Sequence, residues 1–257
     1  MYDIQKTKKN FNKYLEKYDY MNNPDMNRKY YHSFRVMDNA KMIAKSLDLT
    51  EEEIFVSTVI GLLHDIGRFE QIKKFNTFKD GQSFDHGEFG ATLLKNSLRD
   101  YIEIENYDDI ILEAIRNHNK FAINSNLTQR QMLFSKIIRD ADKLDILYES
   151  TEIFWKGKEK SIETLTISDY VYNSILNKKL IKYRDDIVLN DLDSVITTLA
   201  FIFDLNFPIS IKTVYKNNYI DKVLNRFNFQ NTDTINRINK IKQILFEKKI
   251  WFIIKSK

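Results

Sequence analysis

The segment IFVSTVIGLLHDIGR, residues 54–68, is mostly apolar over its first ten residues and then carries a histidine and an aspartate. Thr50 and the three glutamates at 51–53 precede it and supply a helix N-cap with acidic residues in the first turn. Gly67 follows the histidine-aspartate pair and is expected near the helix end. The segment therefore predicts a buried helix over 54–63 that presents His64 and Asp65 at its end.

Helices are also predicted on both sides of this segment. The 257 residues include only six glycines and two prolines, so the chain has few helix breakers. Apolar residues recur at helical spacing in several windows, namely 28–47, 107–117, 128–149, 161–180, 192–203 and 233–254, with an interruption expected at Pro208. Residues 71–85 are polar and lack a clear period, which predicts a long loop. The fold class is therefore all-α. We expect a single helical domain over 1–257, with a core at about 28–150 and a C-terminal helical elaboration at about 151–257.

Composition excludes several function classes. The net charge is 40 − 36 = +4 and the basic residues are scattered, which argues against a nucleic-acid polymer as partner. With no cysteine there is no disulfide framework, thiolate metal site or cysteine nucleophile. The N-terminus is polar rather than signal-like, and no apolar stretch is long enough for a bilayer, so we expect a cytoplasmic protein without membrane association. Three motifs, GxGxxG, the phosphate loop and GxSxG, are absent.

The four histidines all lie in the first half of the chain. His32, His64, His86 and His118 stand in the contexts HSFRV, LLHDIGR, DHGE and RNHN. Alone, each would be interpreted as an ordinary hydrogen-bonded residue. A later segment, IRDADKLD at 138–145, places three aspartates on an apolar-periodic helix, where they cannot all face water. A core-facing carboxylate is costly unless it is paired or bound to metal, so a salt bridge from Asp142 to a nearby Arg or Lys is the alternative. Imidazole and carboxylate together suit Mn, Fe, Co, Ni or Zn.

These residues resemble the signature of a known family. His32, the pair His64 and Asp65, and Asp142, in this order on separate predicted helices, resemble the H…HD…D pattern of the HD superfamily of metal-dependent phosphohydrolases. The contexts HSFRV, LLHDIGR and DADKLD are similar to that family's as well. The resemblance covers about residues 28–150 and implies an HD-domain-like helical bundle. The GYP motif of cyclic-di-GMP phosphodiesterases is absent, which disfavours that substrate.

The resemblance also implies a ligand set. His86 and His118 fall where two-metal members of the family place additional ligands. The implied metal ligands are His32, His64, Asp65, His86, His118 and Asp142, with Asp65 bridging two divalent ions. The ions would be Mn, Fe, Co, Ni or Zn, with Mg as a further candidate. Asp140 remains an alternative to Asp142, which is favoured because the family's last ligand usually follows the alanine.

The implied reaction is hydrolysis of a nucleotide or another small phosphate ester or anhydride by metal-activated hydroxide. Asp65, Arg68 and Lys143 are expected to be catalytic. The expected phosphate-binding residues are Arg35, Arg68, Arg139 and Lys143, although Arg35 or Arg139 could instead hold a ligand carboxylate in place. An HD-type di-iron oxygenase with the same ligands and a non-catalytic metal-binding sensor domain are the alternatives. The partner is a small phosphorylated molecule, and the oligomeric state is left open.

Overall fold

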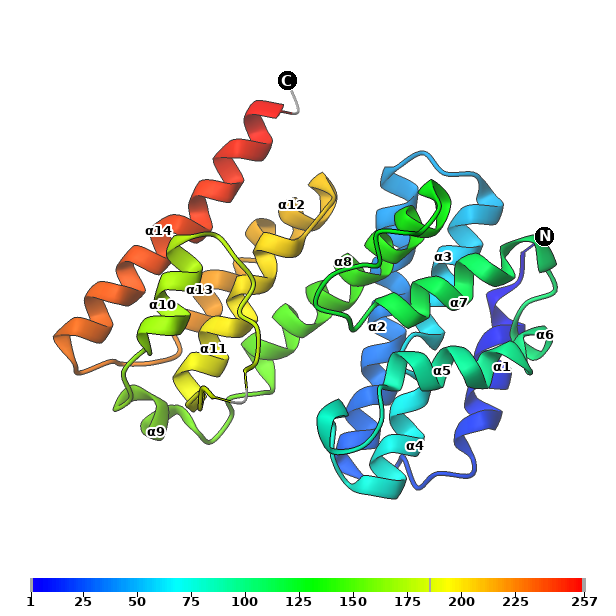
Figure 1. Cartoon of the computed structure of the whole chain (residues 1–257), viewed down its shortest axis with the longest axis horizontal. Helices are drawn as coiled ribbons and strands as arrows, with labels where there is room; N and C mark the ends of the chain where they lie inside the picture. The colour runs from blue at the N-terminus through cyan, green and yellow to red at the C-terminus, as the bar shows by residue number, and fades with distance from the viewer. Residues whose placement is uncertain (1, 185, 256–257) are drawn as a thin grey trace. The chain divides into compact units, whose positions relative to one another are not determined.

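The protein is all-α over the residues that the structure describes. The computed structural model describes residues 2–184 and 186–255, and contains helices and no strand over these ranges (Figure 1). The sequence-based prediction of the fold class is therefore confirmed. The chain divides into two compact units, Met1–Asp142 and Lys143–Lys257, and the boundary falls within the long helix α8 (Gln129–Glu152).

The first unit contains seven helices and the beginning of α8. They are α1 (Ile4–Leu15), α2 (Pro24–Ser46), α3 (Glu51–Leu63), α4 (Ile66–Phe75), α5 (His86–Lys95), α6 (Leu98–Tyr101) and α7 (Asp108–Asn117), with single 3-10 turns at Asp80–Gln82 and Glu105–Tyr107. Helix α3 packs along α2 and also contacts α1 and α7, while α5 packs against α4 and α7. The predicted buried helix is thus central to this unit.

Helix α3 begins and packs as its sequence predicts. Thr50 and Glu53 form a reciprocal capping box, in which each side chain accepts a hydrogen bond from the other residue's backbone N–H. Four apolar side chains have no exposed surface, Val56, Val59, Leu62 and Leu63. Each contributes roughly 1.5–3 kcal/mol to stability through burial. Gly61 allows α2 to approach closely, because a Cβ there would lie 2.7 Å from the Cα of Met37.

Two of the segments predicted from the sequence differ in the structure. Helix α4 continues to Phe75, so the predicted loop is shorter than residues 71–85. Ile66, Phe69 and Ile72 are buried on one face of α4, and their spacing of three residues explains the helix. The predicted helix over 161–180 is instead two short helices, α9 (Glu159–Glu163) and α10 (Asp169–Leu176).

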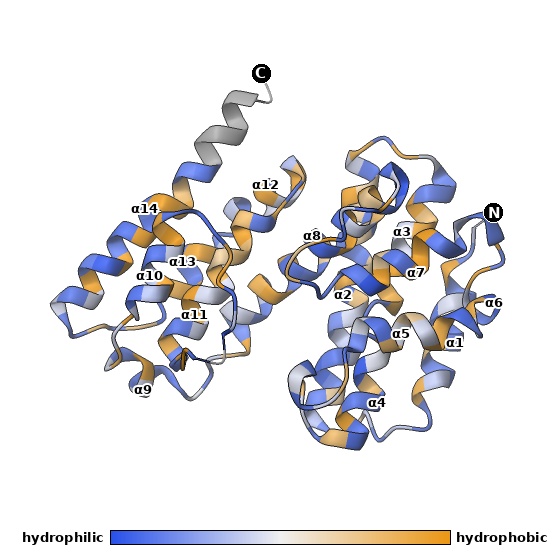
Figure 2. Cartoon of the chain, viewed as in Figure 1, coloured by the Kyte–Doolittle hydropathy of each residue, from blue (hydrophilic) through white to orange (hydrophobic). Residues whose placement is uncertain are grey.

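The second unit is a separate helical assembly. After α8 come α9, α10, α11 (Asp191–Leu199), a 3-10 segment (Ala200–Asp204), α12 (Pro208–Lys216), α13 (Tyr219–Leu224) and α14 (Thr232–Lys255). Pro208 interrupts as predicted and starts α12 at its first turn, where proline is tolerated. Helix α14 contacts α10, α12 and α13, and hydrophobic and hydrophilic residues alternate along the part of it that is coloured in Figure 2. No helix within the described residues is both long and apolar enough to cross a membrane.

Candidate metal centre

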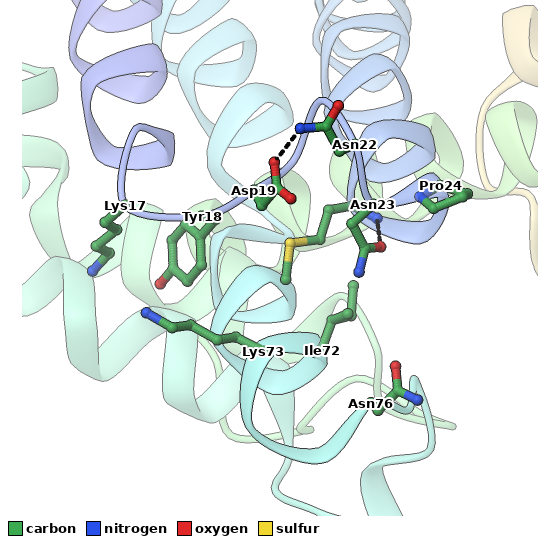
Figure 3. A pocket seen from close by; sticks show the side chains of 10 residues that line it. Lys17, Tyr18, Asp19, Asn22, Asn23, Pro24, Ile72, Lys73 and Asn76 are labelled. Carbon is green, nitrogen blue, oxygen red and sulfur yellow. Dashed lines mark hydrogen bonds between the residues drawn. The ribbon is translucent and has the colours of Figure 1, made fainter.

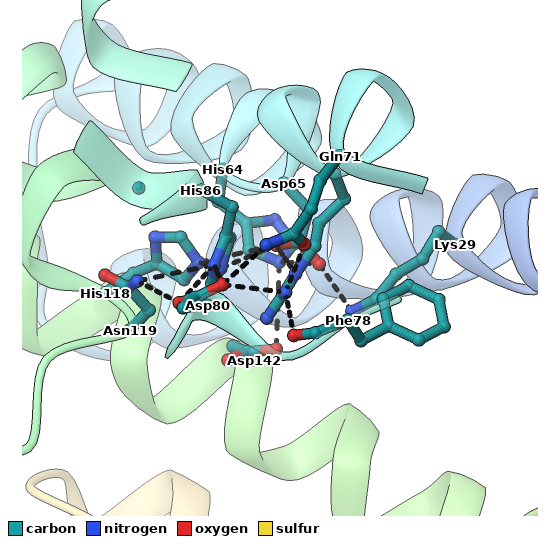
Figure 4. Close-up of polar contacts among 12 residues, drawn as sticks. Lys29, His64, Asp65, Gln71, Phe78, Asp80, His86, His118, Asn119 and Asp142 are labelled. Carbon is teal, nitrogen blue, oxygen red and sulfur yellow. Dashed lines mark hydrogen bonds and ion pairs between the residues drawn. The ribbon is translucent and has the colours of Figure 1, made fainter. Parts of the chain in front are cut away.

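Six side chains from five helices of the first unit meet in one cluster, and Figure 4 labels five of them, His64, Asp65, His86, His118 and Asp142. His32 comes from the middle of α2, His64 and Asp65 from the end of α3, His86 from the start of α5, His118 from the end of α7 and Asp142 from α8. The four histidines and Asp65 are buried, and the side chain of Asp142 is 14% exposed. The structure therefore brings together all six residues that the family resemblance implies as ligands.

Asp65 lies at the centre of the cluster, between two pairs of histidines. Its Oδ2 atom lies 3.5 Å from His32 Nε2 and 3.4 Å from His64 Nε2. Its Oδ1 atom lies 3.2 Å from His86 Nε2 and 3.4 Å from His118 Nε2. Each oxygen thus faces a different histidine pair, as a carboxylate that bridges two ions would.

Asp142 extends the first of these two groups. Its Oδ1 atom lies 3.1 Å from His32 Nε2 and 3.7 Å from His64 Nε2. The ligand atoms of His32, His64 and Asp142 lie within 4.8 Å of one another, close enough to share a metal ion, and so do those of His64, Asp65 and His118. The structure therefore favours Asp142 over Asp140 as the last member of the cluster.

The histidine rings are held with Nε2 turned inward. Nδ1 of His64 lies 2.8 Å from the carbonyl oxygen of Gly61, and Nδ1 of His118 lies 2.6 Å from that of Ile115. A carbonyl can only accept, so Nδ1 carries the proton and donates it in both rings. The lone pair of a neutral ring then lies on Nε2, facing the cluster. This tautomer is the one that metal-binding histidines commonly adopt.

The donor set fits divalent cations. His32 Nε2 and His64 Nε2 are 3.2 Å apart, and His86 Nε2 and His118 Nε2 are 3.0 Å apart. Atoms that bind one ion at about 2.0–2.2 Å are separated by about 2.8–3.6 Å for tetrahedral or octahedral angles. Lone pairs of two neutral rings that face each other at this distance repel unless a proton or a cation lies between them. The spacing and the chemistry of the donors therefore both suit metal binding.

The charges around Asp65 favour its ionised form. Burial opposes ionisation, but Lys29 and the neighbouring histidines outweigh it and hold the pKa of Asp65 well below its usual range. Lys29 Nζ lies 2.5 Å from Asp65 Oδ2 and is nearly buried. Burial likewise lowers the pKa of His118, to about 4, which keeps this ring neutral at pH 7. The cluster thus offers an ionised carboxylate and a neutral imidazole, the forms that bind metal.

The sequence patterns do not identify Lys29 as part of the site. It lies on α2 three residues before His32, so the two side chains share a face of the helix. A lysine one turn from a proposed ligand was the available signal. Such a lysine is usually a solvated surface residue, and only the burial of α2 against α3 shows otherwise.

Two of the predicted phosphate-binding arginines make several contacts with other parts of the protein. Arg68 Nη1 donates to the side chain of Gln71, the carbonyl of Phe78 and the side chain of Asp80, at 2.6, 2.6 and 3.1 Å. The buried Arg139 donates to backbone carbonyls of the segment after α7, including that of His118 at 3.3 Å. These contacts fix the positions of both side chains.

The other two predicted cations lie in different surroundings. Lys143 belongs to the second unit, where its Nζ lies 3.0 Å from Asp204 Oδ2. Arg35 lies on α2, one turn after His32, and is partly buried. Their position in the sequence and their positive charge are therefore the grounds for expecting Arg35 and Lys143 to bind substrate.

A pocket of about 690 Å³ lies elsewhere in the first unit (Figure 3). Its lining comes from the segment between α1 and α2 and from the end of α4, and includes Lys17, Tyr18, Asn23, Lys73 and Asn76. None of the six clustered residues lines it. The pocket and the histidine cluster are therefore separate sites.

Fold and site together define an all-α protein with a buried histidine-aspartate cluster able to hold metal. Comparison with protein families then gives the particular family: residues 30–147 match the family model described as HD domain, and this part of the chain is an HD domain. Searches of curated proteins and of solved structures gave no match. The matched segment contains all six residues of the cluster. The chain therefore carries the domain of a superfamily whose members are generally metal-dependent phosphohydrolases.

Proposed function

We propose that the protein is a metal-dependent phosphohydrolase that cleaves a nucleotide or another small phosphate ester. The observation that carries the proposal is the position of Asp65, whose two oxygens each face a separate pair of histidines. This arrangement supports two ions held side by side. The HD domain over residues 30–147 adds the reaction class.

Each residue of the cluster has a role in this proposal. His32, His64 and Asp142 would hold one ion, His86 and His118 the other, and Asp65 would bridge them. When bound, such ions lower the pKa of water from about 15.7 to about 7 and stabilise charge on phosphoryl oxygens. Lys29 holds Asp65 ionised and in place through its contact with Oδ2.

Substrate phosphate needs positive charge beside the cluster. Three cations lie around the ring of Phe78: Arg28 Cζ, Arg68 Cζ and Lys29 Nζ are 4.9, 5.6 and 5.8 Å from its centroid. Lys29 and Arg68 also contact Asp65, at 2.5 and 3.7 Å. Clustered cations favour an anionic substrate in a site that already binds metal. The proposed phosphate-binding set remains Arg35, Arg68, Arg139 and Lys143, with Arg68 the best placed of those in the first unit.

The test is turnover by protein that has been stripped with a chelator and reloaded with one metal at a time. Mn, Fe, Co, Ni, Zn and Mg are each assayed against a panel of nucleotides and phosphate esters under anaerobic conditions. We expect release of inorganic phosphate or a nucleoside monophosphate with at least one metal. If no metal supports cleavage of any compound in the panel, the proposal that the protein is a phosphohydrolase is wrong.

A second function uses the same donors. Two histidine pairs and two carboxylates also suit a di-iron centre, and the HD superfamily includes di-iron oxygenases. The assay separates the two reactions, because an oxygenase requires iron and consumes oxygen, whereas the hydrolase works without oxygen. Metal binding without turnover in either assay would favour the sensor alternative.

A further inference from the structure

Asp80 lies against the outer edge of the His86 ring. It belongs to the 3-10 turn Asp80–Gln82, within the segment that joins α4 to α5. Its Oδ1 and Oδ2 atoms lie 2.9 and 2.8 Å from His86 Nδ1. Nε2 of the same ring faces Asp65 and His118, at 3.2 and 3.0 Å. The carboxylate of Asp80 therefore contacts the nitrogen that does not face the cluster.

Other side chains hold Asp80 in this position. Gln71 is fully buried on α4, and its Nε2 donates to Asp80 Oδ1 at 2.8 Å. Arg68 Nη1 donates to the same oxygen at 3.1 Å, and Asn119 Nδ2 donates to Oδ2 at 3.0 Å. Three donors from two different segments thus fix one carboxylate that is 31% exposed. Such a set is more than a surface aspartate requires.

The same residues fix the segment that precedes His86. Gln71 Nε2 also donates to Ser83 Oγ and to the carbonyl of Phe84, at 2.8 and 3.0 Å. Arg68 also donates to the carbonyl of Phe78. Helix α4 therefore holds the segment at three points before α5 begins at His86.

We propose that Asp80 is a positioning residue that fixes the tautomer and the orientation of His86, and that it thereby forms the second metal position. The proposal rests on the two-ion site described above and extends it. His64 and His118 donate from Nδ1 to backbone carbonyls, whereas His86 donates to a carboxylate. An imidazole that donates a hydrogen bond to a carboxylate binds metal more strongly than one that donates to a carbonyl. Arg68 and Gln71 act through Asp80.

Direct coordination by Asp80 is the competing role, since Asp80, Asp85 and His86 have donor atoms within reach of one ion. That ion would bind Nδ1 of His86, on the opposite edge of the ring from Asp65. It would also replace the proton that His86 Nδ1 donates to Asp80. An ion bound on the Nε2 side of His86, by contrast, leaves the hydrogen bonds of Asp80 intact. We therefore assign Asp80 a positioning role.

The experiment measures Mn²⁺ binding by calorimetry and metal analysis in the full-length chain. Asp80→Ala removes the contact, and Asp80→Asn keeps an oxygen that can accept from Nδ1. Glu88→Gln is the matched control. Glu88 lies two residues after His86 and pairs with Arg116, so this change also removes one negative charge close to His86. We expect two ions in the wild type and in Glu88→Gln. We expect Asp80→Ala to lower the affinity for the second ion by about 10–100-fold and to leave the affinity for the first ion unchanged. Asp80→Asn should have an intermediate effect.

A second measurement reads the tautomer directly. In metal-free protein, nitrogen NMR of the imidazoles should show His86 protonated on Nδ1 in the wild type and a mixture of tautomers in Asp80→Ala. If Asp80→Ala does not fold, Asp80→Asn decides on both measurements. A second-ion affinity within threefold of the wild type, equal loss of both ions, or a wild type that binds one ion would each overturn the proposal. None of these outcomes depends on phosphate release, which tests the hydrolase separately.

Discussion

Both carboxylate oxygens of Asp65 lie next to positive or potentially positive groups. Lys29 and the four imidazoles lie between 2.5 and 3.5 Å from its oxygens. Removing the carboxylate would leave the lysine and the histidine pairs facing one another without a negative charge. Asp65 is therefore the single side chain on which both proposed metal positions depend.

We expect Asp65→Ala to lose both ions and all metal-dependent turnover. The measurement is metal content after loading and desalting, next to the activity assay. Asp100→Ala is a suitable control, since Asp100 lies on α6, outside the cluster. Retention of two ions by Asp65→Ala would contradict the bridging role.

Helix α4 meets α5 at Gly67. A Cβ at this position would lie 2.5 Å from the carbonyl oxygen of His86, and a backbone atom cannot move aside as a flexible side chain can. A larger residue would therefore clash at position 67, which explains the glycine after the histidine-aspartate pair. It lets the first residue of α5 come close enough for His86 to reach Asp65.

We expect Gly67→Ala to lower the free energy of unfolding by about 1–3 kcal/mol, the usual cost of overpacking. The second ion should be lost before the first, because α5 carries His86. Urea denaturation and metal analysis measure the two effects. Gly81→Ala is the control, since a Cβ there meets nothing within 4 Å. Equal stability of the two variants would contradict the steric argument.

The first turn of α3 is expected to make stability depend on pH. Burial opposes ionisation of Glu53, but hydrogen bonds from Thr50 and the charge of Arg130, 2.5 Å away, lower its pKa. A carboxyl whose pKa is lower in the folded state contributes stability above its unfolded pKa of about 4.3 and loses that contribution as the pH falls through the folded pKa.

We therefore expect Glu53→Gln to cost about 1–2 kcal/mol at pH 7 and progressively less below about pH 4. Urea denaturation at several pH values gives the difference from the wild type. The exposed Glu51, in the same helical turn, supplies the control Glu51→Gln, with an expected effect within about 0.5 kcal/mol. A cost for Glu53→Gln that is the same at pH 3 and pH 7 would contradict the argument.

At the same scale, the sequence predicts helices better than it predicts the contacts between them. Helical spacing predicts α2, α3, α7 and α8 within a few residues, because each has an apolar face with a clear period. The order of histidines and aspartates predicts the six clustered residues. The contacts of Gln71 and Asp80 could not be predicted, because they depend on how α4 lies against the segment before α5. The neighbours of a polar loop residue in the chain do not indicate which distant side chain it will contact.

For the whole molecule, the cluster links helices that are far apart in the chain. His32 and Asp142 are 142 − 32 = 110 residues apart, yet their donor atoms are 3.1 Å apart. An ion bound between them stabilises the folded state, because the unfolded chain does not hold these donors together.

We expect removal of metal by a chelator to lower the melting temperature by about 5–10 °C. A ligand at 100 times its Kd stabilises by about 2.7 kcal/mol, and about 1 kcal/mol corresponds to about 2–4 °C in a chain of this size. Scanning calorimetry with and without Mn²⁺ measures the shift, and Asp65→Ala should show none. An unchanged melting temperature in the wild type would contradict metal binding by the folded protein.

All four histidines of the chain belong to the cluster. Isotopic labelling of histidine alone would consequently yield a spectrum with four imidazole environments, every one of them from the proposed metal centre. Occupancy by a paramagnetic ion would broaden all four, and occupancy by zinc would shift them without broadening. An untagged preparation would thus report its metal state through a single amino-acid type, with no introduced probe.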